Sequence, residues 1–218
     1  MSKHVLRHFS LVMLTLFACL TLGVAQELKP VPLPPPQTSG GRPLMEALKD
    51  RQSSREFSSQ QLSPQVLSNL LWAAFGVNRP DSGKRTAPSA MNWQEIDIYV
   101  ATQDGLYVYD AQANTLNPVL AQDVRGATGT QSFVKEAPVD LVYVADLAKT
   151  GGGGGEEQTL YTAADTGFIA QNVYLFCASE GLAVVVRGSV DRPPLAKLMK
   201  LRPNQKIILA QTVGYPKK

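Results

Sequence analysis

The sequence predicts an α+β fold in which a central, mostly antiparallel sheet is flanked by helices. Segments with apolar residues at helical spacing are separated along the chain by segments that alternate as strands do. Residues 96–100 and 105–109 alternate in this way, and the intervening Gln103-Asp104 is typical of a hairpin turn. A chain of 218 residues is long enough for one domain with a sizeable core.

The predicted helices have clear start and stop signals. Pro43 opens a short first helix. The second begins with Ser63 as N-cap and Pro64 at the first helical position, and it ends at Gly76. The third helix, residues 157–180, is the longest, and it has apolar residues on more than one face. That pattern fits a central core helix and a subunit contact equally well.

Three more strands are predicted from apolar, β-branched runs at residues 139–144, 182–186 and 207–213. Five consecutive glycines, Gly151–Gly155, lie between the first of these strands and the long helix. This composition predicts a mobile loop.

The composition excludes several classes of protein. Lys and Arg number 21 and Asp and Glu 18, so the formal net charge is +3 and no nucleic-acid partner is expected. The two histidines, His4 and His8, lie in the first ten residues, which excludes a histidine-based triad in the mature domain. Two cysteines cannot form a disulfide scaffold or a four-thiolate zinc site, and we expect no metal site.

Residues 1–25 have the features of a cleaved export signal. A short basic start precedes an almost uninterrupted apolar run that ends in small residues at Gly23 and Ala25. No basic stop-transfer cluster follows, so we expect an exported, periplasmic protein with no stable membrane span after cleavage. Cys19 supplies a weaker alternative, a lipoprotein signal.

Residues 26–41 are rich in proline and end in Gly40-Gly41. This composition is typical of a semi-rigid spacer. We therefore expect the globular domain to cover residues 42–218.

The segment just after the first predicted helix carries a candidate anion site. Alternate residues of an extended chain share a face, so Arg51, Ser53 and Arg55 would point the same way. Two guanidinium groups and a hydroxyl on one face match a phosphate. A solvated basic turn explains the same composition equally well.

Two other segments are candidates for contact with a planar ligand. Pro88 and Ser89 stiffen a turn, and Asn92 offers a carboxamide that both donates and accepts hydrogen bonds. Gly188 follows Arg187 at the end of a predicted strand, where a backbone N–H could reach a ligand atom without a side chain in the way. An ordinary turn is the simpler interpretation of both segments.

Together these segments resemble the FMN-dependent nitroreductase superfamily, and within it the shorter branch that includes thiazole/oxazole-forming peptide dehydrogenases. The resemblance runs from about Pro43 to Pro216. It rests on the order and spacing of six motifs: RQSSREF at 51–57, APSAMN at 87–92, GLYVYD at 105–110, DTGFIAQN at 165–172, Gly181-Leu182 and VGYP at 213–216.

The resemblance implies how an FMN phosphate would be held. Arg51 and Ser53 would bind the phosphate, and Arg55 would reach the ribityl chain or the isoalloxazine ring. Basic residues after the last strand often complete this site in the family, so Lys217 or Lys218 would serve here.

The resemblance also implies contacts to the flavin ring. Pro88, Ser89 and Asn92 would line it, with Asn92 as the polar contact. Arg187 and Gly188 would place a backbone N–H against the reactive N5 atom and would thereby be the catalytic positions.

The implied protein is a domain-entwined homodimer with two flavins at its interface. Electrons would pass from NAD(P)H, or from another donor, through flavin N5 to a small organic acceptor. An exported flavin- or small-ligand-binding protein without turnover is the alternative. A cell-envelope interaction domain without flavin is a third hypothesis, and a peptide-modifying dehydrogenase stays open.

Overall fold

The computed structural model describes residues 28–151 and 155–217, so the predicted export signal and the centre of the glycine run lie outside the described residues. The strands of the main sheet are β1 Val31–Pro32, β4 Ile96–Ala101, β5 Leu106–Asp110, β6 Thr115–Leu120, β7 Val139–Asp146, β8 Ala183–Arg187 and β9 Gln205–Gly214. They lie in the order β1-β6-β5-β4-β7-β9-β8, and every neighbouring pair is antiparallel. The predicted α+β fold with a central antiparallel sheet is confirmed.

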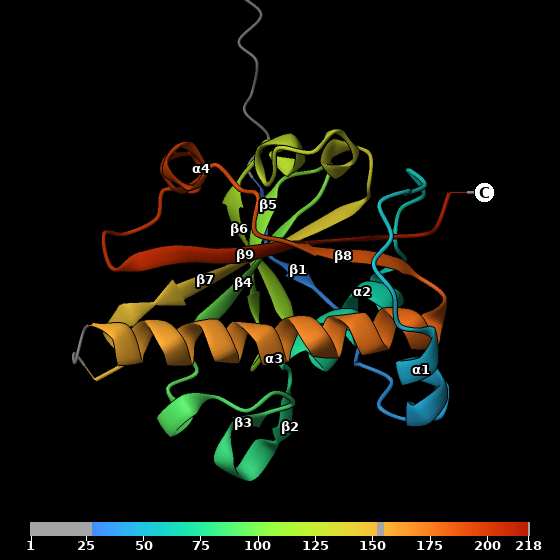
Figure 1. The fold of residues 1–218 in the computed structure, drawn as a ribbon, viewed down its shortest axis with the longest axis horizontal. Coiled ribbons are helices and arrows are strands. Elements are labelled where there is room, and N and C mark those ends of the chain that lie inside the picture. Colours follow the sequence, from blue (N-terminus) through green and yellow to red (C-terminus); the bar gives the residue numbers. More distant parts are fainter. Residues whose placement is uncertain (1–27, 152–154, 218) are drawn as a thin grey trace, which may run out of the picture.

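Helices cover both faces of this sheet (Figure 1). Their bounds are α1 Leu44–Asp50, α2 Pro64–Phe75, α3 Glu156–Glu180 and α4 Arg192–Leu198. The strand β7 is buried along its whole length, and its side chains alternate between two cores. Leu141 and Tyr143 belong to the core that α2 and α3 share, whereas Val142 and Val144 belong to the core under α4.

The predicted helix boundaries are confirmed to within a residue or two. The Ser63 hydroxyl accepts the Val66 N–H at 3.2 Å, as an N-cap does, and α2 ends before Gly76. The long helix α3 ends at Gly181, which has a left-handed φ of 68° and donates its N–H to Cys177.

Several short elements were not predicted. A second hairpin joins β2 Val77–Arg79 to β3 Lys84–Arg85, and β6 and α4 were also missed. The strand β6 contains Asn117 and Pro118, residue types that strands usually avoid. Its pairing with β5, rather than its own composition, makes it a strand.

The proline-rich segment differs from its prediction. Val31–Pro32 pairs with β6, and Leu33 is buried and donates its N–H to the Asn114 carbonyl at 3.0 Å. The Pro34 carbonyl accepts from Ser68 Oγ at 2.6 Å and from Asn114 Nδ2 at 2.9 Å. A polyproline backbone leaves its carbonyls free, and these side chains bind them. The spacer predicted over 26–41 is therefore wrong for this part, which belongs to the domain.

Among the helices that the structure describes, none combines the length and the apolar character needed to cross a bilayer.

Candidate functional site

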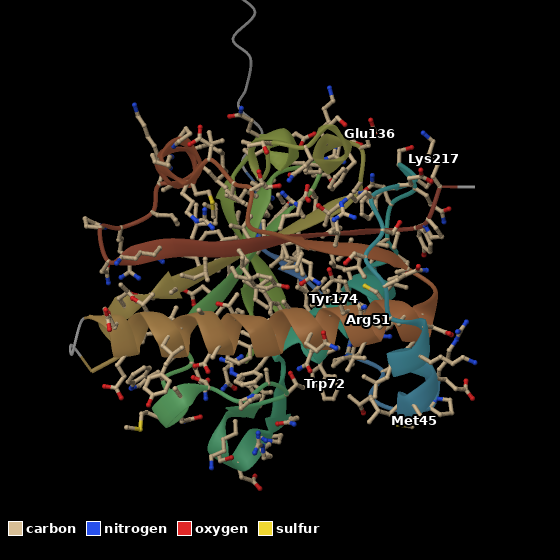
Figure 2. All side chains as sticks on the ribbon, in the orientation of Figure 1. Met45, Arg51, Trp72, Glu136, Tyr174 and Lys217 are labelled. Carbon is tan, nitrogen blue, oxygen red and sulfur yellow. The ribbon has the colours of Figure 1, made fainter. Side chains whose placement is uncertain are left out.

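The hydroxyl of Tyr174, on α3, joins two segments that were predicted to bind the same ligand. It lies 2.7 Å from Ser53 Oγ and accepts the Val186 N–H of β8 at 2.9 Å. Either hydroxyl can be the donor in the Ser53–Tyr174 pair. When Tyr174 donates, the Ser53 hydroxyl hydrogen is left for a ligand. The Arg51 guanidinium lies over the Tyr174 ring, with Cζ 5.3 Å from the ring centroid (Figure 2).

The chain that carries Arg51 and Ser53 runs along the free edge of β8. The Ser54 N–H donates to the Val184 carbonyl at 2.9 Å. Further on, Ser58 donates to the Tyr215 carbonyl at 2.9 Å, and Phe57 forms a bridge with Pro216. These backbone bonds fix the segment against β8 and against the residues that directly follow β9.

A cavity of about 540 Å³ opens beside Arg51. Three cations line it, Arg42, Lys49 and Arg51, together with a single acid, Asp50. Asp50 pairs with Arg42 at 2.7 Å, so the remaining positive charge faces the cavity. This donor set suits an anion and fits the phosphate of a flavin mononucleotide. Arg42 and Lys49 were not among the predicted residues.

Arg55 lies in a different cavity from Arg51. It shares a hollow of about 420 Å³ with Lys217, Phe133 and Glu136. The Lys217 N–H donates to the Glu56 carbonyl at 3.4 Å, which ties the C-terminal segment to the motif around Arg55. The structure therefore brings Arg55 and Lys217 together, and Arg51 and Ser53 together, without joining the two pairs.

A third, smaller hollow of about 210 Å³ is lined by the three residues predicted to contact the flavin ring, Pro88, Ser89 and Asn92. Pro88 and Asn92 are exposed there. The Ser89 hydroxyl is engaged within its own loop, since it donates to Glu95 Oε2 at 3.2 Å and accepts the Gln94 N–H at 2.8 Å. Ser89 shapes this loop with its side chain.

The side chain of Arg187 points away from the other candidates. Its guanidinium is buried and donates to Asp140 Oδ1 at 2.8 Å and to the Thr128 carbonyl at 2.7 Å. Burial raises the pKa of Asp140 to about 7, while the Arg187 charge and the Thr212 hydroxyl act against that shift. Only the Arg187 backbone is left for a ligand, and the predicted role of this residue concerned a backbone N–H.

Two glycines next to this ion pair have different neighbours. A Cβ added to Gly129 would lie 1.9 Å from Arg187 Nη1, so the ion pair needs a glycine there. A Cβ added to Gly188 would come no closer than 3.9 Å to any described atom, which is ordinary contact with Leu209. Nothing in the described part of the chain demands a glycine at 188.

The one free thiol among the described residues, Cys177, lines the cavity beside Arg51 but is buried. Burial raises its pKa well above the usual range, so the thiol stays protonated at neutral pH and is a poor nucleophile.

The comparisons with known proteins agree with this geometry. The model of the family described as "Nitroreductase family" matches residues 48–215.

The chain belongs to the nitroreductase family.

A nitroreductase-type protein of Methanocaldococcus jannaschii is 31% identical over 169 residues, which cover 73% of this chain and 85% of that protein. A crystal structure of a nitroreductase-type protein from Ralstonia eutropha has a TM-score of 0.84 and 43% identity, and covers 90% of this chain and 93% of that one. The NADPH:FMN oxidoreductase of Vibrio harveyi, solved with NAD⁺, shares the fold, with a TM-score of 0.61 and 21% identity over 80% of this chain and 69% of that one.

As a nitroreductase, the chain is an oxidoreductase. Its fold places Arg51, Arg55 with Lys217, and Pro88 with Ser89 and Asn92 in three separate hollows. Besides Arg42 and Lys49, the sequence analysis missed Tyr174 and Gly129. The tyrosine gave no signal because Ser53, its partner, lies 121 residues away.

The buried ion pair gives a direct test of how β8 is held. At a pH above the raised pKa of Asp140, where its carboxylate is charged, we expect Asp140→Asn to lower the free energy of unfolding by about 3 kcal/mol, because it leaves the Arg187 charge buried without a counter-charge. The half-exposed pair of Lys149 and Asp97, 2.7 Å apart, supplies the control: Asp97→Asn should cost less than about 1 kcal/mol. Urea unfolding followed by circular dichroism measures both, and equal losses would contradict the role of the buried pair.

Proposed function

We propose that this nitroreductase is an FMN-dependent enzyme that passes electrons from a reduced nicotinamide, or from another donor, to a small organic acceptor. The observation that carries the proposal is the convergence on Tyr174 of Arg51, Ser53 and the edge of β8. The shared fold of the Vibrio harveyi NADPH:FMN oxidoreductase supports it. FMN, when bound, supplies the hydride and electron chemistry, and no acid or base from the chain is required.

The chain's own residues would bind and orient the cofactor. The Arg51 guanidinium and the Ser53 hydroxyl would donate to the phosphate. The backbone N–H of Gly188 lies at the end of β8, two residues after the N–H that Tyr174 accepts, and alternate residues of a strand direct their N–H groups to the same edge. This N–H would address flavin N5.

A second copy of the chain would complete the site. An exposed stripe follows α3 at helical spacing: Leu160, Ala163, Ala164, Gly167 and Phe168. Leu44 and Met45 on α1 are 62% and 75% exposed. Apolar residues of this size are exposed together where a partner covers them. We propose a homodimer that joins the three hollows across this stripe.

We further propose that residues 1–25 direct export to the periplasm and are then removed. FMN and NAD(P)H are cytoplasmic, so an exported enzyme would load its flavin first or acquire it outside, and would accept electrons from a different donor.

The phosphate assignment predicts a loss of flavin affinity. Arg51→Ala should raise the Kd for FMN about 10-fold or more, because it removes a charge-assisted bond. Lys197→Ala removes an exposed cation from α4 and serves as the matched control. Quenching of flavin fluorescence measures both. An unchanged Kd in Arg51→Ala would refute the phosphate site.

Turnover is tested on the same preparation. Bound flavin should bleach when NADPH or dithionite is added and recover its colour when a quinone or a nitroaromatic compound follows. Flavin that binds but transfers no electrons to any acceptor would identify a binding protein instead. A protein that stays colourless after reconstitution with FMN would refute the proposed function altogether.

If the chain forms a homodimer through the α3 stripe, a charge introduced on that stripe should separate the subunits. Phe168→Glu should give a monomer in light scattering and should weaken FMN binding about 10-fold or more, since a buried charge at an interface is costly. Lys206→Glu, on the exposed part of β9, should change neither property. A wild-type chain that binds FMN as a monomer would contradict the proposal.

A further inference from the structure

The loop that carries Ser89 and Asn92 is held in a strained conformation. Met91, Asn92 and Gln94 have positive φ angles of 52°, 56° and 49°. Residues other than glycine adopt this region at a cost, and they keep it only where the surrounding contacts impose it. The contacts of this loop therefore identify what holds it.

Two buried carboxyl groups make those contacts. Glu95 Oε2 accepts the Ser89 hydroxyl at 3.2 Å, and Ser89 in turn accepts the Gln94 N–H, which closes the loop on itself. The next residue, Ala90, donates its N–H to Asp165 Oδ2 on α3 at 2.8 Å. Glu95 is fully buried and Asp165 is 3% exposed.

The two carboxyl groups bind adjacent residues of this loop, Ser89 and Ala90. Glu95 Oε1 is buried and has no hydrogen-bond partner among the described residues. Two adjacent buried carboxylates repel, and one proton between them removes a charge and satisfies the orphaned oxygen. Burial, followed by the charge of Asp165, raises the pKa of Glu95, in keeping with this arrangement.

We propose that Glu95 keeps its proton and donates it from Oε1 to Asp165, and that this carboxyl–carboxylate hydrogen bond fixes the strained loop on α3. Glu95 and Asp165 are thereby positioning residues for the loop that lines the flavin. The role of the loop in flavin binding rests on the proposed function. The shared proton does not, because it would be present with or without a ligand.

The other charged groups around Glu95 are engaged elsewhere. Lys149 Nζ pairs with Asp97 at 2.7 Å and lies 3.5 Å from the Gln94 carbonyl. Arg85 donates to the Gln94 side chain at 2.8 Å, and Asp146, whose N–H reaches the Glu95 carbonyl, has its carboxylate on Arg202. In the described part of the chain, none of these cations bonds the Glu95 carboxyl group.

The shared proton has a defined pH dependence. A carboxyl group whose pKa is raised by folding stabilises the folded form at low pH, and this contribution is lost as the pH rises through the folded-state pKa. Above that pKa, both carboxylates are charged, and the loop should detach from α3. Flavin affinity of the wild-type protein should therefore fall as the pH rises through the folded-state pKa of Glu95.

The protonation state of Glu95 is followed by carbon-13 NMR of protein labelled at the glutamate carboxyl carbons. One resonance should remain in the protonated range above the pH at which the other glutamates titrate, should be absent from Glu95→Gln, and should titrate lower in Asp165→Asn. A Glu95 signal that titrates with the exposed glutamates would overturn the proposal, whether or not FMN binds.

The effect on the loop is measured by the Kd for FMN in a pH series that brackets the Glu95 titration seen by NMR. Glu95→Gln keeps a donor for Asp165 and an acceptor for Ser89, so below that titration its Kd should stay within about 2-fold of wild type, and it should lose the weakening at higher pH. Glu95→Ala should bind about 10-fold more weakly. Glu156→Gln, at the exposed start of α3, is the control.

If the wild type binds FMN and Glu95→Ala binds it with equal affinity, the positioning role is refuted and the proposed function stands. No FMN binding by the wild type would refute the proposed function, and the NMR titration would still decide the shared proton.

Discussion

The arrangement of the candidate site depends on one buried hydroxyl group. Tyr174 Oη receives the Val186 N–H from β8 and binds Ser53, while the phenol ring lies under Arg51. The neighbours of Tyr174 on α3, such as Ile169 and Val173, are fully buried in the core against the sheet. The packing of α3 therefore sets the position of the hydroxyl, and the hydroxyl sets the distance between the segment with Arg51 and the edge of β8.

Two further pairs of buried polar side chains also position segments of the site. On one face of the sheet, Arg187 and Asp140 form an ion pair that holds the end of β8, so the Arg187 side chain has a structural role. On the other face, Glu95 and Asp165 hold the strained loop before β4. In the proposed function the redox chemistry belongs to the flavin, so the contribution of the chain would be the placement of backbone and polar groups. Buried pairs suit that task because removing one partner is costly.

Local patterns were enough to predict the main elements, and they failed where long-range contacts decide the outcome. Ser63 marked the start of α2, and the alternation at 96–100 predicted β4, because caps and periodicity act within a few residues. The proline-rich segment was misread because its carbonyls are bound by Ser68 and Asn114 from distant parts of the chain. The direction of the Arg187 side chain follows from Asp140, 47 residues away, which no local pattern reveals.

The affinity of Tyr174→Phe for FMN tests the central claim most directly, measured by fluorescence titration with circular dichroism as the control for folding. Phenylalanine keeps the ring under Arg51 and removes only the hydroxyl that joins Ser53 to β8. If this hydroxyl organises the site, the variant should fold with the same secondary structure and bind FMN about 10-fold more weakly, since a buried N–H and the Ser53 hydroxyl lose their partner. A correctly folded variant with wild-type affinity would contradict the account.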